Sequence, residues 1–284
     1  MKNIISYYYN LNDIRIIIKK DNYYVKHHND YYVFDKVRNH YELLQLYSLT
    51  NNNNIFDKII VNKDQTIFTI YNGEEYVLIK IVPYKKMRLL PIVSLEFSKV
   101  NYLLRNNWSQ IWSKKIDYIE YQYDHIKGKY SIIDESIDYY IGISENAIQY
   151  YELSNSLEDI VPLCFCRRRI IMNKLYNPTN IVVDYQQRDI AEYIKYMYFN
   201  DLMDSKKIVE LIKKFRFNKK EEILLYSRLL FPSYYFDIYE KIVNDRENTL
   251  ELEKIIKRRK GYESVLIDIY ANLHKLKRVD WLGN

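Results

Sequence analysis

The sequence has little cysteine. Its 284 residues include two cysteines, Cys164 and Cys166. The single residue between them cannot span an unstrained disulfide, and there is no second pair of cysteines to complete a zinc site. We therefore expect a reduced, cytoplasmic protein in which both thiols are buried on one face of a strand.

Glycine is also scarce, with five residues in the chain, and the first of them is Gly73. Residues 1–72 therefore contain no glycine-rich loop that could bring backbone N–H groups against the phosphates of a nucleotide. This absence excludes from the N-terminal region a phosphate-binding loop of the kind that protein kinases use.

Long apolar runs are missing as well. No stretch approaches the roughly 18 apolar residues of a membrane-spanning helix, so we expect no transmembrane segment. Residues 1–10 carry one lysine and no small-residue cleavage site, and we interpret them as a first strand, not a signal peptide. The net charge of +6 permits phosphate binding, but it is too small for this length to indicate a nucleic-acid partner.

Tyrosine, by contrast, is abundant, with 32 residues. Isoleucine, asparagine and lysine are frequent too, and because these residues have AT-rich codons the composition indicates a low-GC genome. We expect tyrosine to do much of the apolar packing while its hydroxyl stays near water.

The pattern of apolar residues predicts a mainly β structure for residues 1–82, interrupted by one helix at residues 40–49. The expected strands are residues 16–18, 23–25, 31–34, 58–61, 66–71 and 76–82. The dipeptide Asn72-Gly73 between the last two is the strongest hairpin signal in the chain.

After Pro83 the apolar period changes from about 2 to about 3.6 residues. One helix is predicted with an apolar face, ended by Lys127-Gly128-Lys129, and that face is formed by Trp112, Ile116, Ile119, Tyr123 and Ile126. A second helix is expected from about Asp134. Short strands are expected at 163–165 and 181–183, and helices from Gln186 onward.

This order predicts an α+β fold with two lobes in one domain. Residues 1–82 would form a β-rich N-lobe, and residues 83–284 a mainly helical C-lobe.

Three stretches carry a family resemblance, namely residues 32–79, residues 166–192 and residues 224–232, the last ending at Phe231-Pro232. They resemble the aminoglycoside phosphotransferase and choline kinase type of the protein kinase-like superfamily, above all its spore-coat protein S branch. The resemblance implies a protein kinase-like two-lobed fold. Asp35 stands where the family has the lysine of its "yvLK" strand, and Lys36 would face the other side of that strand.

The second stretch decides the chemistry. Active members of the family carry His-Gly-Asp, four residues and then Asn. Their aspartate accepts or orients the proton of the substrate hydroxyl, and their asparagine helps to hold magnesium. The corresponding run here is Cys166-Arg167-Arg168, four residues and Asn173, so the base position is occupied by Arg168.

Further along, Val183-Asp184-Tyr185 is similar to the triplet that supplies the metal-binding aspartate of the family. The resemblance implies ATP and Mg²⁺ as cofactors. It also implies Lys36, Asn173 and Asp184 as cofactor-binding residues, the last two being the metal ligands. For the two metal ligands a structural alternative stays open. Asp184 would be a turn residue after a buried strand, and Asn173 would be an asparagine without a functional role in an asparagine-rich chain.

Arginine cannot act as the general base, because its pKa above about 12 keeps it protonated and it has no acceptor atom. Arg168 could instead hold a phosphate or carboxylate, or lie in an ion-paired loop. The sequence therefore predicts that the chain has no catalytic residue. From the resemblance we expect a pseudokinase with a binding or assembly role, related to the spore coat of a spore-forming bacterium.

Two other functions stay open. An ATP-dependent small-molecule phosphotransferase could use Asp184 or Asp189 in an altered site, although Asp189 also fits a helix cap or first-turn acid. The basic clusters at 213–220 and 257–260 could bind nucleic acid or an anionic membrane surface, unless they are solvated helix ends. The expected partner is an assembly protein or a small anionic ligand, and the expected location is cytoplasmic or spore-associated.

Overall fold

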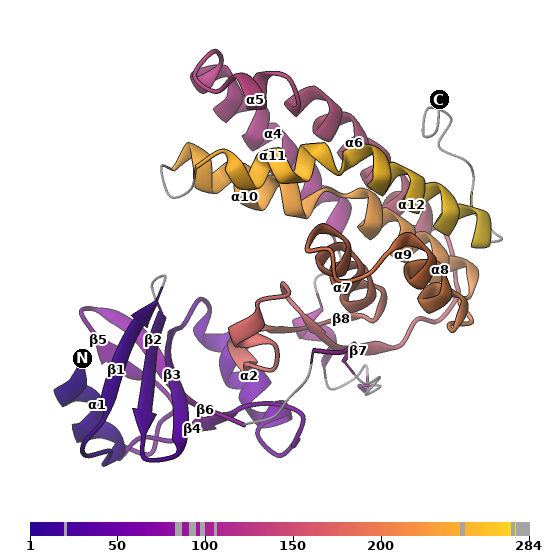
Figure 1. Ribbon diagram of the computed structural model, residues 1–284. Coiled ribbons are helices and arrows are strands. Elements are labelled where there is room, and N and C mark those ends of the chain that lie inside the picture. Colours follow the sequence, from indigo (N-terminus) through magenta and orange to yellow (C-terminus); the bar gives the residue numbers. More distant parts are fainter. Residues whose placement is uncertain are drawn as a thin grey trace. The chain divides into compact units, whose positions relative to one another are not determined.

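The computed structural model describes residues 1–19, 22–82, 87–90, 95–96, 100–104, 107–244, 248–273 and 276 (Figure 1). The chain divides into two compact units, which we call the sheet unit and the helical unit. The sheet unit is Met1–Arg88 with Phe165–Val183, and the helical unit is Leu89–Cys164 with Asp184–Asn284. The division into lobes at residue 82 stays a prediction, and Pro83, after which the apolar period changes, lies outside the described residues.

The start of the chain is a helix, α1 (Lys2–Tyr9), so the prediction of a first strand there was wrong. Ile5 and Tyr9 are four residues apart and both buried, which is the spacing of one helical face. The Tyr9 hydroxyl lies 2.8 Å from Oγ1 of Thr69, which fixes the end of the helix to the sheet. Asn10 then ends the helix in the left-handed region (φ 53°).

The sheet unit is built on an antiparallel sheet with the strand order β1-β2-β3-β6-β4, while β5 pairs with β6. The strands are β1 (Arg15–Lys19), β2 (Asn22–His27), β3 (Asp30–Lys36), β4 (Lys58–Ile60), β5 (Thr69–Tyr71) and β6 (Glu74–Ile81). Helix α2 (His40–Thr50) follows β3, and Asn39 caps its N-terminus by accepting from the backbone N–H of Glu42. These elements lie close to the predicted ones.

The turn between β5 and β6 shows why the hairpin signal was reliable. Asn72 and Gly73 both have positive φ, 51° and 77°. Two such residues in a two-residue loop form the type I′ turn, whose twist matches that of the flanking strands.

Two more strands, β7 (Leu163–Arg167) and β8 (Ile181–Tyr185), form a separate two-stranded sheet, as the sequence predicted. The segment between them contains two short 3-10 helices, Met172–Lys174 and Pro178–Asn180. Within the sheet unit this segment is anchored by the Asp57 N–H, which donates to Tyr176 O (3.0 Å).

The helical unit consists of the following helices: α4 (Trp108–Ile126), α5 (Ser131–Asp134), α6 (Ile137–Asn155), α7 (Gln187–Phe199), α8 (Ser205–Lys213), α9 (Lys219–Leu230), α10 (Ser233–Val243), α11 (Leu250–Lys257) and α12 (Arg259–Asn272). The predicted break after α4 is confirmed, since Gly128 has φ 82°. Helix α9 is buried from Glu222 to Leu230 and packs against α6 and α7, so it is central to this unit. None of the helices in the described ranges is long and apolar enough to cross a membrane.

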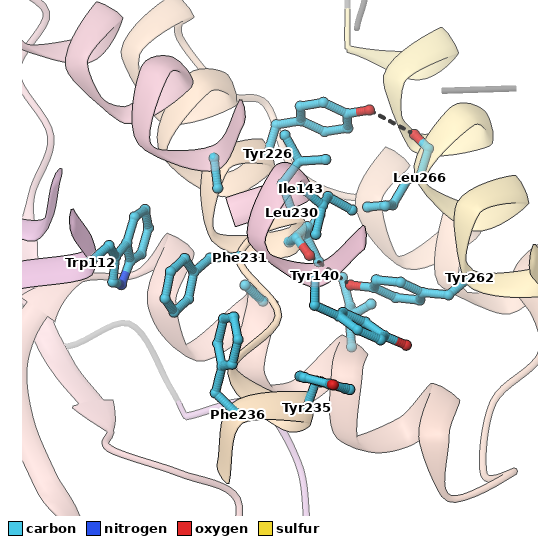
Figure 2. Packing of buried hydrophobic residues seen from close by; sticks show 14 of the residues in the cluster. Trp112, Tyr140, Ile143, Tyr226, Leu230, Phe231, Tyr235, Phe236, Tyr262 and Leu266 are labelled. Carbon is cyan, nitrogen blue, oxygen red and sulfur yellow. Dashed lines mark hydrogen bonds between the residues drawn. The ribbon is translucent and has the colours of Figure 1, made fainter. Parts of the chain in front are cut away.

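Aromatic side chains pack among aliphatic ones in the core of the helical unit (Figure 2). Tyr140 and Tyr235 stack with ring centroids 3.7 Å apart. We had expected tyrosine hydroxyls to stay near water, but these hydroxyls lie in the interior. A buried hydroxyl needs a partner, and the backbone supplies several: Tyr262 donates to Leu229 O (3.0 Å) and Tyr226 to Leu266 O (3.4 Å).

These buried tyrosines predict a loss of stability at alkaline pH. Burial raises the pKa of Tyr239 to about 12 and raises those of Tyr140, Tyr226 and Tyr235 further. The folded pKa of each tyrosine lies above the unfolded value of 10.0. The stability that the protonated tyrosines contribute is therefore complete below pH 10.0 and is lost as the pH rises from there through the folded pKa values. We expect the urea midpoint to fall progressively above this pH.

The variant Tyr239→Phe provides the control, since it removes one of the raised groups and should make the alkaline fall shallower. A urea midpoint that stays constant while tyrosinate absorbance rises in the folded protein would contradict the prediction.

Candidate functional site

The segment from β7 to β8 carries the residues that the sequence singled out. Arg168 and Asn173 belong to the sheet unit, and Asp184 belongs to the helical unit.

Arg168 directly follows β7 and is held in place on both sides. Its N–H donates to Asn180 O (2.7 Å), and its Nη2 donates to Oε1 of Glu42 on α2 (2.9 Å). The Arg168 and Glu42 side chains are only 18% and 16% exposed. The position at which the resemblance implies a catalytic base therefore holds a cation in a part-buried ion pair.

A cavity beside this ion pair is very small. It has a volume of about 20 Å³ and is lined by Arg38, Asn39, Glu42, Leu43, Leu46, Arg168, Pro178, Thr179 and Ile181. Such a volume holds about one water molecule. An anion site at Arg168 would therefore require the Arg168–Glu42 pair to separate.

Asp35 on β3 occupies the place that the family resemblance gives to a lysine, and it is buried. Its Oδ1 accepts from Lys174 Nζ (2.6 Å), and its Oδ2 accepts from Asn177 Nδ2 (3.2 Å) and from the Thr179 hydroxyl (2.6 Å). Both carboxylate oxygens thus bind the segment between β7 and β8. This arrangement is a satisfied buried network, which is the form in which an interior charge is tolerated.

Lys36, the next residue, lies on the opposite side of β3. Its side chain is 54% exposed, and its Nζ lies 2.9 Å from Oε1 of Glu74. The hydrogen bond with Glu74 raises the pKa of Lys36. The register Asp35↔Val77 and Lys36↔Tyr76 is continuous, so no bulge turns Lys36 inward.

Asn173 lies in the 3-10 helix Met172–Lys174, and its side chain is outside the described part of the structure. The polar residues that do organise this segment are Lys174, Asn177 and Thr179, which sequence reasoning missed. One local signal was available: Asn177 precedes Pro178 and accepts from the Thr179 N–H (2.8 Å), the pattern of an N-cap followed by proline.

In the helical unit, Asp184 is 1% exposed and lies between two arginines. Arg228 Nη2 donates to its Oδ1 (3.0 Å) and Oδ2 (2.9 Å), and Arg188 Nη1 donates to its Oδ2 (3.0 Å). Both guanidinium groups also stack near the Trp108 ring, at 4.6 Å for Arg188 and 4.8 Å for Arg228. The carboxylate therefore has two cationic partners where the resemblance implies a magnesium ion.

Asp189 lies in the first turn of α7, as predicted for a first-turn acid, and is buried. Its Oδ2 accepts from the N–H of Leu90 (3.0 Å), which ties the chain before α4 to α7. Cys164 is also buried in this unit, and burial raises the pKa of its thiol to about 11. Asp189 thus binds a backbone N–H group, and the Cys164 thiol lies in the interior.

The basic segment 213–220 is the connection between α8 and α9. Phe215 and Phe217 stack on each other at 5.2 Å and pack against the core. Asn218 and Glu221 form a reciprocal capping box at the start of α9. The apolar and capping residues of this segment thus have structural roles, and the binding of nucleic acid or a membrane by its lysines stays a prediction.

Within the described ranges, no group of three or more His, Cys, Asp or Glu side chains is arranged to hold a metal ion. The roles of Asn173 and Asp184 as metal ligands, and of Lys36 as a nucleotide-binding residue, stay predictions. Of the three, Asp184 has the donor atoms that Mg²⁺ prefers, but these atoms already accept hydrogen bonds from Arg188 and Arg228.

The fold defines the class of protein. The chain is similar to a spectinomycin phosphotransferase in an AMP-bound complex, with a TM-score of 0.61, 10% identity, and coverage of 96% of this chain and 98% of that one. It is also similar to an aminoglycoside phosphotransferase from Alicyclobacillus acidocaldarius, with a TM-score of 0.55, 11% identity and 97% coverage of both chains. The expected α+β, protein kinase-like fold is therefore confirmed.

The family follows from the sequence. The model of the family described as spore coat putative kinase YutH matches residues 2–269, and the chain belongs to this family. A relative, the endospore coat-associated protein YutH of Bacillus subtilis (strain 168), is 27% identical over 266 residues, which cover 79% of this chain and 78% of that protein. The resemblance to spore-coat kinase-like proteins is confirmed.

The surroundings of Asp184 predict a strong effect on stability. Asp184→Ala would leave the buried guanidinium groups of Arg188 and Arg228 without their shared carboxylate, and we expect it to lower the free energy of unfolding by about 3–5 kcal/mol. Urea denaturation measures this loss.

The matched control is Asp117→Ala on α4, because Asp117 is exposed and its loss should change stability by no more than about 0.5 kcal/mol. If the two variants unfolded at the same urea concentration, Asp184 would not be the structural acceptor described above.

Proposed function

We propose that this protein is a pseudokinase, a kinase-fold protein without phosphotransfer activity, and that it acts as a binding component of the spore coat. The proposal rests on two ion pairs in the sheet unit that differ from the ion pair of an active kinase. Asp35 on β3 pairs with Lys174, and Glu42 on α2 pairs with Arg168.

Protein kinases require the opposite arrangement. Their β3 strand supplies a lysine that pairs with a glutamate of the following helix and contacts the nucleotide phosphates. Here the β3 position is acidic, and the helix acid is paired elsewhere. A carboxylate at position 35 would repel a nucleotide phosphate, and three donors already occupy it.

Arg168 removes the other catalytic element. A general base typically contributes about 10²–10⁴ in rate, and a permanent cation cannot take up the proton of an incoming hydroxyl. The pair with Glu42 further fixes the guanidinium in a structural role.

In the helical unit, the ion pairs of Asp184 with Arg188 and Arg228 also support the pseudokinase proposal. A magnesium ion at this carboxylate would have to displace two guanidinium groups that are buried with it. Removing partners from a buried ion pair is costly, so we propose that Asp184 stabilises the fold and does not bind metal.

The location is proposed by analogy with the relative from Bacillus subtilis, whose name states that it is associated with the endospore coat. The family description gives the same association. We therefore propose that the protein is made in the cytoplasm and assembles with coat proteins.

The competing function is an ATP-dependent small-molecule phosphotransferase that works with Asp184 or Asp189 in an altered site. The kinase-like fold favours it. It predicts cooperative binding of ATP and Mg²⁺, which the pseudokinase proposal does not.

Thermal-shift titration separates the two functions. A ligand present at 100 times its dissociation constant would add about 2.7 kcal/mol of stability, which is readily measured. We expect no shift from ATP and Mg²⁺ together. A saturable shift that needs both ligands and is lost in the isosteric variant Asp184→Asn would favour the enzyme instead, which turnover of ATP with transfer to an alcohol would then establish.

A fluorescent fusion expressed in sporulating Bacillus subtilis without its own YutH tests the location. We expect a ring of fluorescence around the spore. Lys36→Gln removes the exposed lysine that the resemblance implies as a nucleotide-binding residue, and it should localise like the parent. Diffuse fluorescence from both fusions would refute the coat role.

A further inference from the structure

A surface pocket lies within the helical unit, where the turn between α5 and α6 meets the junction of α11 and α12. It has a volume of about 400 Å³ and is lined by Ile132, Glu135, Ser136, Ile256, Lys257, Arg259 and Lys260. This volume is in the range of pockets that bind small molecules, roughly 300–1,000 Å³.

The lining is positively charged and incompletely paired. It contains three cations, Lys257, Arg259 and Lys260, against one acid, Glu135. Lys257 and Lys260 form no ion pair within the described part of the chain. Arg259 pairs with Glu263, whose Oε1 lies 3.6 Å from Nε, but this buried Nε has no hydrogen-bond partner among the described residues.

Neighbouring basic residues differ in this respect. Lys254 lies 2.7 Å from Glu251, and Arg258 pairs with Asp201. A second pocket, of about 350 Å³, includes Arg258 and Lys207, and both of these have acidic partners. Among the described residues of the pocket at α11 and α12, Lys257 and Lys260 therefore carry positive charge without an acidic partner, beside the Arg259–Glu263 pair.

Two structural features orient this charge toward a ligand. The Arg259 guanidinium lies over the Tyr139 ring, 4.6 Å from its centroid, which holds the planar group in place. Helix α6, with 19 residues, begins at the pocket, and its N-cap Ser136 makes no side-chain cap because its hydroxyl donates to Ile132 O (2.6 Å). The positive end of the helix dipole thus adds to the cationic side chains.

From this arrangement we propose that the pocket binds a small phosphorylated ligand. The phosphate group would contact Lys257, Arg259 and Lys260, since a guanidinium fork and ammonium groups suit phosphate oxygens. The apolar side chains of Ile132 and Ile256 would contact the organic part. The site lies wholly in the helical unit and does not depend on the residues used in the pseudokinase proposal.

Isothermal titration calorimetry on the full chain tests the site with phenyl phosphate, inorganic phosphate and, as the uncharged reference, phenol. We expect saturable binding of phenyl phosphate, weaker binding of inorganic phosphate and none of phenol. The double variant Lys257→Gln/Lys260→Gln should weaken the binding of phenyl phosphate by at least about tenfold, because each charged hydrogen bond contributes measurably to affinity.

The matched control is Lys213→Gln/Lys214→Gln, which removes the same charge from exposed lysines at the end of α8. It should bind phenyl phosphate like the parent. Thermal unfolding in phosphate-free buffer verifies that both variants fold.

A third variant, Arg259→Lys, keeps the charge but removes the fork, and we expect it to weaken phenyl phosphate severalfold while leaving unfolding unchanged. Equal weakening in the 257/260 and 213/214 variants would show general charge attraction and overturn the site. Binding to phosphatidic acid vesicles without saturable binding of phenyl phosphate would overturn the small-ligand proposal in favour of a lipid surface.

Discussion

The carboxylate of Asp184, held between Arg188 and Arg228 above the Trp108 ring, connects the elements of the helical unit. It joins the end of β8 to α7 and α9, while Trp108 belongs to α4. Charges at this depth persist only when each has its partners, because an uncompensated buried ion is costly. The stacked aromatic core of the unit adjoins this neutralised centre through Trp108.

The sheet unit follows the same constraint. Asp35 is buried because Lys174, Asn177 and Thr179 satisfy both of its oxygens, and Glu42 is part-buried because Arg168 pairs with it. In a kinase, such acidic and basic groups are left available to nucleotide, metal and substrate. In this protein Asp35 and Glu42 are engaged with basic and polar side chains of their own unit.

Much of the fold could be predicted from local patterns. Alternation of apolar residues located the strands, Asn72-Gly73 located a type I′ turn, and the helical period from Trp112 located α4. Helix α1 was missed because its eight residues show only two buried positions, too few to separate a helix from a strand. The inward hydroxyls of the core tyrosines were missed because their partners are backbone carbonyls of other helices.

By itself the sequence determined most of the helices and strands and the family, since each of these follows from residue types at short spacing. Only the tertiary structure decided which charges are paired. Asp35 and Lys174 are 139 residues apart and Asp184 and Arg228 are 44 apart. No local pattern encodes such partners, because their interaction exists only after packing has brought them together and removed the water between them.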